Sequence, residues 1–248
     1  MTVRPDTTAY GPELSAVYDL VYQGRGKDFG REAGVVTRAI LAAHPRAASL
    51  LDVACGTGEH LRAFQADFAH VAGLELSPQM CEVARVKLPG VEVYEADMRA
   101  FALDRRYDAV CCLFSSIGYM SSAAELDAAI GCMANHLVPG GALVVDPWWF
   151  PERFLDGYVS DAVVRDGDRL VVRMAQSVRT GDVVRQEAHY LLASPAGIEH
   201  FINVQRITLF TRDQYESAFR RASCAVRYLE GDEDVALSGR GLFVGVRQ

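Results

Sequence analysis

Short apolar runs alternate with helix-like stretches between residues 49 and 147. The runs that predict strands are "SLLDVAC", "HVAGLEL", "VEVYEAD", "YDAVCCLFSS" and, after the turn "VPGG", "ALVVDPWWF". The stretches that predict helices are "GEHLRAFQADF", "SPQMCEVARVKL", which begins with the cap Ser77 and Pro78, and "SAAELDAAIGCMANHL". Strands that are apolar throughout and alternate with helices indicate a parallel sheet covered on both faces. The pattern therefore predicts a doubly wound α/β fold with a mostly parallel, Rossmann-like sheet.

A β-rich segment follows this core after "WWFPERF". Between residues 158 and 210 the turn sequences "DGD", "TGD" and "SPAG" separate β-rich runs, and no helix-length apolar period lies between them. We expect an antiparallel β insertion that serves as a lid over the acceptor or pairs two subunits. In residues 211–248 the helix "TRDQYESAFRRAS", with Thr211 as its N-cap, precedes "AVRYLEG" and "GLFVGVRQ", which predict a strand hairpin.

Residues 1–48 are predicted to form an N-terminal helical region, with the helix-like "YGPELSAVYDLVYQ" followed by the loop "GRGKDFG". Its tyrosines Tyr10, Tyr18 and Tyr22 lie at helical spacings, which is typical of core packing and also allows a role in binding. Together with a core at residues 49–150, these segments fit a single domain of 248 residues.

Composition narrows the class of protein further. Half of the residues are apolar, the formal net charge is −7 and no block of Lys and Arg is present, which argues against a nucleic-acid-binding surface. Neither a signal peptide nor a run of about 20 apolar residues is visible, so we expect no membrane segment and a cytoplasmic location. The cysteines form no CxxC pair and the histidines are scattered, so we expect reduced thiols and no metal site.

Acidic residues follow or end three successive predicted strands. Asp52 lies just before the glycine turn that contains Gly56, Glu75 ends the next strand and Asp97 ends the third. Because the carboxyl ends of parallel strands line the binding crevice of this fold, we expect these side chains to face one ligand. Asp52 and Gly56 would face a charged amino-acid group, Glu75 a ribose, and Asp97 an adenine amino group. This combination favours S-adenosylmethionine, which carries no phosphate.

The chain resembles class I methyltransferases over residues 49–150 and, over nearly its whole length, the TDP-amino-sugar N,N-dimethyltransferases of antibiotic biosynthesis. The stretches that carry this resemblance are "YDLVYQGRGKDF", "ASLLDVACGTGEHL", "GLELSPQM", "LFSSIGYM", "PWWFPERF", "RITLFTRDQYESAF" and "SGRGLFVG". The glycine motif is common to very many methyltransferases, whereas "PWWFPE" and "SGRGLF" are much more specific.

The resemblance implies S-adenosylmethionine as cofactor and two rounds of methylation on one nitrogen of a TDP-linked amino-deoxysugar. The candidate cofactor contacts are Tyr18, Asp52, Ala54, Gly56, Glu75, Leu76, Met80, Asp97, Met98 and Phe114. The candidate substrate contacts are Tyr22, Arg25, Lys27, Ser116, Asp146, Trp148, Trp149 and Arg240.

Transfer of a methyl group from a sulfonium to an amine is an in-line displacement, so positioning supplies most of the acceleration and no strong base is required. Tyr119 and Tyr10 are the candidate catalytic residues, with Tyr119 orienting the amine or only lining the pocket. Trp148 and Trp149 are expected either to face a cation or to pack in the core. Arg240, between two glycines, is the first candidate for the substrate pyrophosphate, and Arg25 and Lys27 are the second.

Several alternatives remain open at this point. A methyltransferase core with another small-molecule natural product as acceptor, for N- or O-methylation, has the same cofactor signals. An NAD-dependent α/β dehydrogenase is a different class, but the third glycine of its motif and a Tyr-x-x-x-Lys pair are missing. A non-enzymatic binding module is disfavoured by the acids at the strand ends. A homodimer is expected if the insertion pairs subunits.

Overall fold

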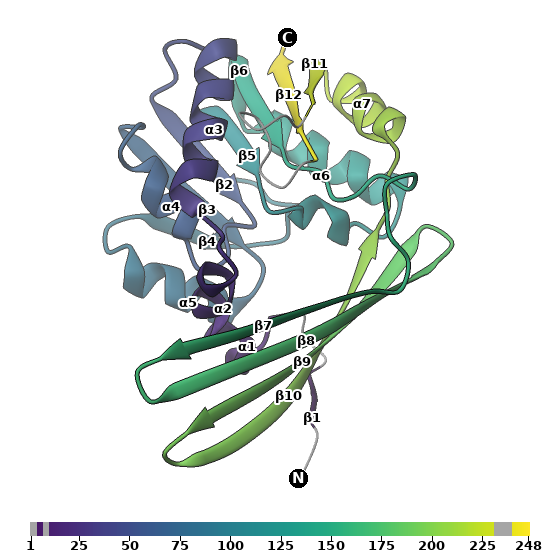
Figure 1. Ribbon diagram of the computed structural model, residues 1–248. Coiled ribbons are helices and arrows are strands. Elements are labelled where there is room, and N and C mark those ends of the chain that lie inside the picture. Colours follow the sequence, from purple (N-terminus) through teal and green to yellow (C-terminus); the bar gives the residue numbers. More distant parts are fainter. Residues whose placement is uncertain (1–3, 7–9, 231–239) are drawn as a thin grey trace. The chain divides into compact units, whose positions relative to one another are not determined.

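The computed structural model describes residues 4–6, 10–230 and 240–248. The chain divides into two compact units, one within residues 29–153 and 208–248 and the other within residues 1–28 and 154–207 (Figure 1). We call them the core unit and the insertion unit. Among the described residues, no helix is long and apolar enough to cross a membrane.

The core unit is built on a seven-stranded sheet in the order β11-β12-β6-β5-β2-β3-β4. Its strands are β2 (Ser49–Val53), β3 (His70–Glu75), β4 (Glu92–Glu95), β5 (Tyr107–Cys112), β6 (Leu137–Val145), β11 (Cys224–Leu229) and β12 (Leu242–Arg247). Strands β2 to β6 are parallel, and β12 pairs with β6 and β11 in the antiparallel sense. The predicted α/β fold with a mostly parallel sheet is confirmed.

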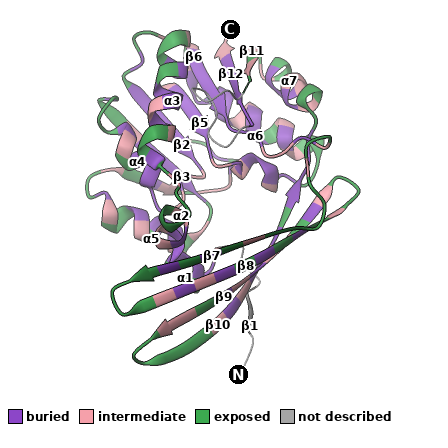
Figure 2. Cartoon of the chain, viewed as in Figure 1, coloured by how far each residue is buried: buried purple, intermediate pink, exposed green. Residues whose placement is uncertain are grey.

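Apolar side chains on both faces of this sheet explain its two helical layers. The helices are α3 (Phe29–Ala43), α4 (Glu59–Phe64), α5 (Pro78–Lys87), the 3-10 helix η1 (Ser116–Tyr119), α6 (Ala123–Asn135) and α7 (Arg212–Arg221). On β2, Leu50 packs in one apolar cluster with Ile40 of α3, whereas Leu51 packs in another. Ile130 of α6 and Phe219 of α7 belong to that second cluster. Figure 2 shows the buried strands between these helices.

Local capping signals correctly mark two helix starts. Ser77 Oγ accepts a hydrogen bond from the Met80 amide at 3.3 Å, and Pro78 opens α5. Thr211 and Gln214 exchange two hydrogen bonds that close a capping box at the start of α7. Both N-caps predicted from the sequence are confirmed.

Several boundaries differ from the sequence prediction, among them the following three. Helix α4 ends at Phe64, four residues before the predicted end, and the ring of Phe68 instead packs against Phe64 at 6.0 Å. Helix α3 begins inside the predicted loop "GRGKDFG", because the buried ring of Phe29 packs against His60 at 5.0 Å. The predicted turn "VPGG" lies within β6, where the register with β5 shifts and Gly140 adopts a φ of 77°.

The insertion unit is built on a five-stranded sheet in the order β1-β10-β9-β8-β7. Its strands are β1 (Arg4–Asp6), β7 (Tyr158–Asp166), β8 (Arg169–Thr180), β9 (Val183–Ser194) and β10 (Gly197–Thr208). Strands β7, β8 and β9 pair in the antiparallel sense, while β1, which the pattern did not predict, pairs in parallel with β10. The predicted helix "YGPELSAVYDLVYQ" is divided into α1 (Pro12–Ser15) and α2 (Tyr18–Gly24), and α2 packs against β7.

The two faces of this sheet differ in composition. One face, which we call the buried face, carries the buried side chains of alternate positions, among them Ala162, Val171, Arg173, Ala175, Ala188 and Tyr190. The other, which we call the exposed face, carries Val159, Val163, Met174, Val178 and Leu191. The alternation follows the two-residue period of a strand.

Candidate active site

Asp52 is the last residue but one of the fully buried strand β2, and its carboxyl group is almost fully removed from water. Its Oδ1 accepts a hydrogen bond from Cys111 Sγ at 3.4 Å, while its Oδ2 has no hydrogen-bond partner among the described residues. Burial, together with a smaller contribution from the nearby carboxylate of Glu75, raises the pKa of Asp52 to about 7. A buried carboxylate oxygen without a partner fits a ligand that brings a cationic donor.

The loop after β2 holds several residues in the left-handed backbone region. Gly56 and Gly58 have φ values of 56° and 82°, and Ala54, at 59°, adopts this conformation without being glycine. A side chain added at Gly56 would meet no atom within 4 Å, so the loop leaves open space there. The Gly56 amide donates to Glu75 Oε2 at 2.9 Å, which ties the loop to the end of the next strand.

Glu75 is the centre of this strand edge. Its Oε1 accepts hydrogen bonds from the Leu76 and Ser77 amides, both at 2.9 Å, in addition to the bond from Gly56. Burial raises the pKa of Glu75 although the three amides act in the opposite direction. A carboxylate offers about four lone-pair directions, so one ligand hydroxyl can be accepted without the loss of a backbone bond. The geometry therefore suits the predicted contact with a ribose.

Asp97 follows β4 and is held by Arg99. Arg99 Nε lies 3.0 Å from both carboxylate oxygens, Nη2 lies 2.5 Å from Oδ2, and the Arg99 amide donates to Oδ1 at 2.9 Å. These bonds lower the pKa of Asp97. Arg99 also pairs with Glu125 at 2.7 Å, which links this edge to α6. The sequence analysis did not identify Arg99. Its position two residues after an acidic residue near a strand end could have indicated that it pairs with that residue.

The other candidate cofactor contacts of the core unit have different environments. Met80 and Met98 are buried, whereas Leu76 is 62% exposed. Phe114 and Ser115 both adopt positive φ, 54° and 62°, where the chain leaves β5 and enters η1. Two consecutive non-glycine residues in this region store strain, which is concentrated at functional sites in proteins.

The segment that contains η1 is tied to the end of β6. Ser115 Oγ donates to the Pro147 carbonyl at 3.1 Å, and Ser116 Oγ donates to the Leu113 carbonyl at 3.0 Å. Tyr119 is partly buried against the core cluster that contains Leu51. The hydroxyl of the candidate Ser116 is therefore used within its own turn.

Asp146 and Arg240, both candidate substrate contacts, contact each other. Arg240 Nη2 lies 3.8 Å from Asp146 Oδ2, and Arg240 Nε donates to the Pro147 carbonyl at 3.1 Å. The guanidinium lies 5.3 Å from the ring centre of Trp149. Both charged side chains are buried, and the carboxylate of Asp146 offsets the charge of Arg240. Trp148 and Trp149 are half-buried.

The candidate tyrosines of the insertion unit form one aromatic cluster. The ring centres of Tyr10 and Tyr18 are 5.9 Å apart, and those of Tyr18 and Tyr22 are 4.6 Å apart. The guanidinium of Arg25 lies 5.6 Å from the ring centre of Tyr22. The Lys27 amide donates to the Tyr22 carbonyl at 3.0 Å. Five of the predicted site residues thus lie together in this short segment.

In chemical terms the strand edge of the core unit offers two buried carboxyl groups, a third held by arginine, and a loop of backbone amides. A ligand with an ammonium group, a ribose and an amino-substituted base matches these groups. Among the residues that the structure describes, no group of three or more histidine, cysteine, aspartate or glutamate side chains could hold a metal ion.

Comparison with known proteins defines the class. Residues 50–141 match the protein family described as a methyltransferase domain. The solved structure of an S-adenosylmethionine-bound amino pentose methyltransferase from Micromonospora echinaspora is 49% identical, with a TM-score of 0.85 over 94% of this chain and 97% of that chain. Together with the strand-edge site, this identifies the chain as a class I N-methyltransferase with S-adenosylmethionine as cofactor. The dehydrogenase alternative is thereby excluded.

Two relatives define the family more narrowly. The dTDP-3-amino-3,4,6-trideoxy-alpha-D-glucopyranose N,N-dimethyltransferase of Streptomyces venezuelae is 50% identical over 96% of this chain and 99% of the relative. The dTDP-3-amino-3,6-dideoxy-alpha-D-glucopyranose N,N-dimethyltransferase of Streptomyces fradiae is 49% identical over 96% of this chain and 92% of the relative. The chain belongs to the dTDP-amino-sugar N,N-dimethyltransferase family, and the resemblance seen in the sequence is confirmed.

Proposed function

We propose that this chain methylates the amino group of a dTDP-linked amino-deoxysugar twice, in the biosynthesis of an antibiotic. The observation that carries this proposal is the 50% identity to a sugar N,N-dimethyltransferase over 96% of the chain. A third relative, from Saccharopolyspora spinosa, is named for a dTDP-4-amino sugar and is 42% identical over 99% of the chain. The relatives are thus named for dTDP-amino sugars with the amine at C3 or at C4.

The residues of this chain act mainly by holding the reactants. S-adenosylmethionine, when bound, supplies an electrophilic methyl group. We propose that Glu75 holds its ribose, that Asp52 accepts its ammonium group and that Asp97 binds its adenine amino group. Attack by a neutral amine breaks the carbon–sulfur bond and forms a carbon–nitrogen bond, and the released proton passes to solvent. Positioning alone can contribute about 7 to 11 kcal/mol to such a step.

For the acceptor we keep the sequence predictions as proposals. Tyr119 would orient the amine, because a neutral tyrosine hydroxyl is a good hydrogen-bond partner and a poor base at pH 7. Tyr10, at the edge of the tyrosine cluster, would take the second catalytic position. The remaining proposed acceptor contacts are Tyr22, Arg25, Lys27, Ser116, Asp146, Trp148, Trp149 and Arg240.

The activity test uses the purified protein with S-adenosylmethionine and either a dTDP-3-amino or a dTDP-4-amino hexose. Mass spectrometry should show one and then two added methyl groups on one of the sugars. A matched reaction with the 3-hydroxy sugar in place of the amino sugar should show none. A protein that binds the cofactor, modifies neither amino sugar and methylates other small amines would support the alternative of a different natural-product acceptor.

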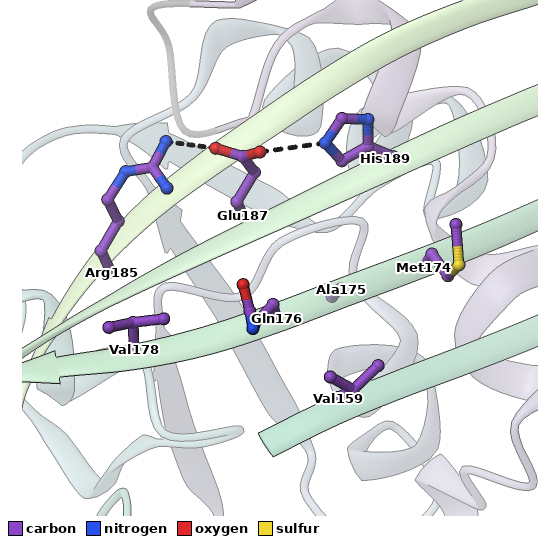
Figure 3. A pocket seen from close by; sticks show the side chains of 8 residues that line it. All are labelled: Val159, Met174, Ala175, Gln176, Val178, Arg185, Glu187 and His189. Carbon is purple, nitrogen blue, oxygen red and sulfur yellow. Dashed lines mark hydrogen bonds and ion pairs between the residues drawn. The ribbon is translucent and has the colours of Figure 1, made fainter. Parts of the chain in front are cut away.

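We further propose that the exposed face of the insertion unit pairs two copies of the chain. Most of the large apolar side chains exposed in the described residues belong to this unit. Figure 3 shows a pocket on this face, lined by Val159, Met174, Ala175, Gln176, Val178, Arg185, Glu187 and His189. Within it Glu187 pairs with both Arg185 and His189. Charges of both signs on one apolar face permit the self-complementary contact that a twofold dimer requires.

Substitution of Met174, which is 58% exposed, by glutamate should convert the dimer to a monomer. The dimer should dissociate because an unpaired charge in an apolar interface is strongly unfavourable. Light scattering coupled to size-exclusion chromatography measures the change in mass. Val86→Glu, at a 79% exposed position on α5, is the matched control and should remain dimeric. Wild-type protein of monomer mass would contradict the proposal.

We also propose a cytoplasmic location. All six cysteines are free thiols, and protein thiols stay reduced in the cytosol, where disulfides are rare.

A further inference from the structure

An arginine is buried on the sheet of the insertion unit. Arg173 lies at a buried-face position of β8, between Val171 and Ala175, and only 2% of its surface is exposed. Its register partner on β9 is Tyr190, which is also buried. Neither sequence pattern nor resemblance had indicated a role for Arg173.

The partners of Arg173 are neutral. Its Nε donates to the Tyr190 hydroxyl at 3.2 Å, and its Nη1 donates to Ser160 Oγ at 3.1 Å. Among the ion pairs of the described residues, none joins a carboxylate to Arg173. The buried Arg240 of the core unit, by contrast, has Asp146 at 3.8 Å.

A buried guanidinium without a counter-ion is costly, because the hydration lost on burial is not replaced by a negative charge. A guanidinium has five N–H donors, and the two hydrogen bonds of Arg173 occupy only part of this planar fork. Arginine binds phosphate oxygens in a bidentate manner with this fork. The missing negative charge therefore points to an anionic ligand.

The surroundings of Tyr190 supply a second cation and aromatic surfaces. The Tyr190 ring stacks on Phe201, with ring centres 4.7 Å apart. Burial raises the pKa of Tyr190 to about 12, with a further contribution from Tyr22, and the charges of Arg173 and Arg25 act in the opposite direction. Arg25, already a candidate substrate contact, thus lies within electrostatic range of the same hydroxyl. Two arginines and two tyrosines of one unit share this region.

We propose that Arg173, held by Tyr190 and Ser160, binds the pyrophosphate of the nucleotide-sugar acceptor. The inference rests on the proposed function, since it assumes an acceptor with a pyrophosphate. It adds a residue that the sequence prediction did not contain, and it assigns the anion to the buried face of the insertion unit.

The test compares Arg173→Gln with wild-type protein in calorimetric titrations with TDP and, separately, with S-adenosylhomocysteine. Loss of a charge-assisted bond should weaken TDP binding about 10- to 100-fold and leave adenosylhomocysteine binding unchanged. Arg169→Gln is the matched control, because Arg169 lies on the same strand, is 55% exposed and pairs with Asp166. It should bind TDP as wild type does. Arg173→Lys, which keeps the charge without the fork, should bind TDP with intermediate affinity.

Two results would overturn the proposal. One is TDP affinity in Arg173→Gln equal to that of wild type. The other is a parallel loss of TDP binding, adenosylhomocysteine binding and thermal stability in both Arg173→Gln and Arg173→Lys. That result would mean that Arg173 has a structural role only. Failure of the proposed function is a separate result, because wild-type protein could bind TDP through Arg173 and still methylate no amino sugar.

Discussion

Glu75→Ala should weaken the binding of S-adenosylhomocysteine by at least about 100-fold, since each buried donor left without an acceptor costs about 1–3 kcal/mol. The carboxylate accepts hydrogen bonds from three backbone amides, those of Gly56, Leu76 and Ser77. Alanine would leave these amides and the ribose hydroxyl without their acceptor. The glycine loop would also lose its link to the end of β3. Calorimetric titration with adenosylhomocysteine measures the effect.

Glu82→Ala is the matched control for this prediction. Glu82 lies in α5, on the same βα unit, and its side chain is exposed. The control should bind adenosylhomocysteine as wild type does. Urea unfolding of both variants separates a loss of binding from a loss of folding. If Glu75→Ala were folded and kept wild-type affinity, the assignment of the cofactor edge would be wrong.

The core of the fold could be predicted because its signals are local. An apolar strand, a glycine turn and an amphipathic helix are each encoded within a dozen residues, and Ser77 and Thr211 cap helices through bonds to residues three positions away. The pairing of β1 with β10 joins residues almost two hundred positions apart. No local pattern encodes such a pairing, because it depends on how the whole sheet assembles. The strand β1 was missed for this reason.

The site shows the same division between local and non-local information. The turn around Gly56 could be predicted because glycine tolerates the left-handed region without strain. Ala54, Phe114 and Ser115 adopt that region as well, although their residue types do not favour a positive φ. Their conformations are imposed by the surrounding structure. The strained backbone at the ends of β2 and β5 therefore became visible only in three dimensions.

Charged partners were the least predictable part of the site. Asp146 and Arg240 were both predicted to contact substrate, but their mutual contact joins residues 94 positions apart in the chain. Arg173 belongs to the strand "RLVVRMAQSVRT", in which every second residue faces the buried side. An arginine in phase with Val171 and Ala175 is a detectable anomaly once the register is known. From sequence alone the register of that strand is open.

Asp52→Asn should increase the stability of the cofactor-free protein at pH 8 and weaken its binding of the cofactor. Burial raises the pKa of Asp52 in the folded chain from 3.8 to about 7. The folded state therefore holds this proton over a pH range in which the unfolded state has lost it, so the free energy of unfolding falls as the pH rises from about 4 to 7. The decrease amounts to at most about 4 kcal/mol. Cofactor-free Asp52→Asn should thus be more stable than wild type at pH 8 and similar at pH 4, as measured by urea unfolding.

The affinity of the wild-type protein for the cofactor should increase as the pH rises, because the ammonium group of the cofactor favours the ionised carboxylate of Asp52. Wild-type affinity for adenosylhomocysteine should increase about fivefold between pH 6 and 7, reach about ten times the pH 6 value near pH 8, and level off above that pH. Asp52→Asn should bind weakly and lack this increase. Equal pH dependence in the two proteins would show that another group, such as Glu75, is responsible.

Asp108→Asn provides a control of opposite sign. Burial disfavours the charge of Asp108 as well, but hydrogen bonds from the Ala48 amide, the Ser49 hydroxyl and the Ser49 amide hold its pKa below the usual value. Its contribution to stability is therefore present above pH 4 and is lost as the pH falls further. Asp108→Asn should be less stable than wild type at pH 7 and should bind adenosylhomocysteine normally. The comparison would then separate an aspartate whose carboxylate is satisfied by the fold, Asp108, from one that requires a ligand, Asp52.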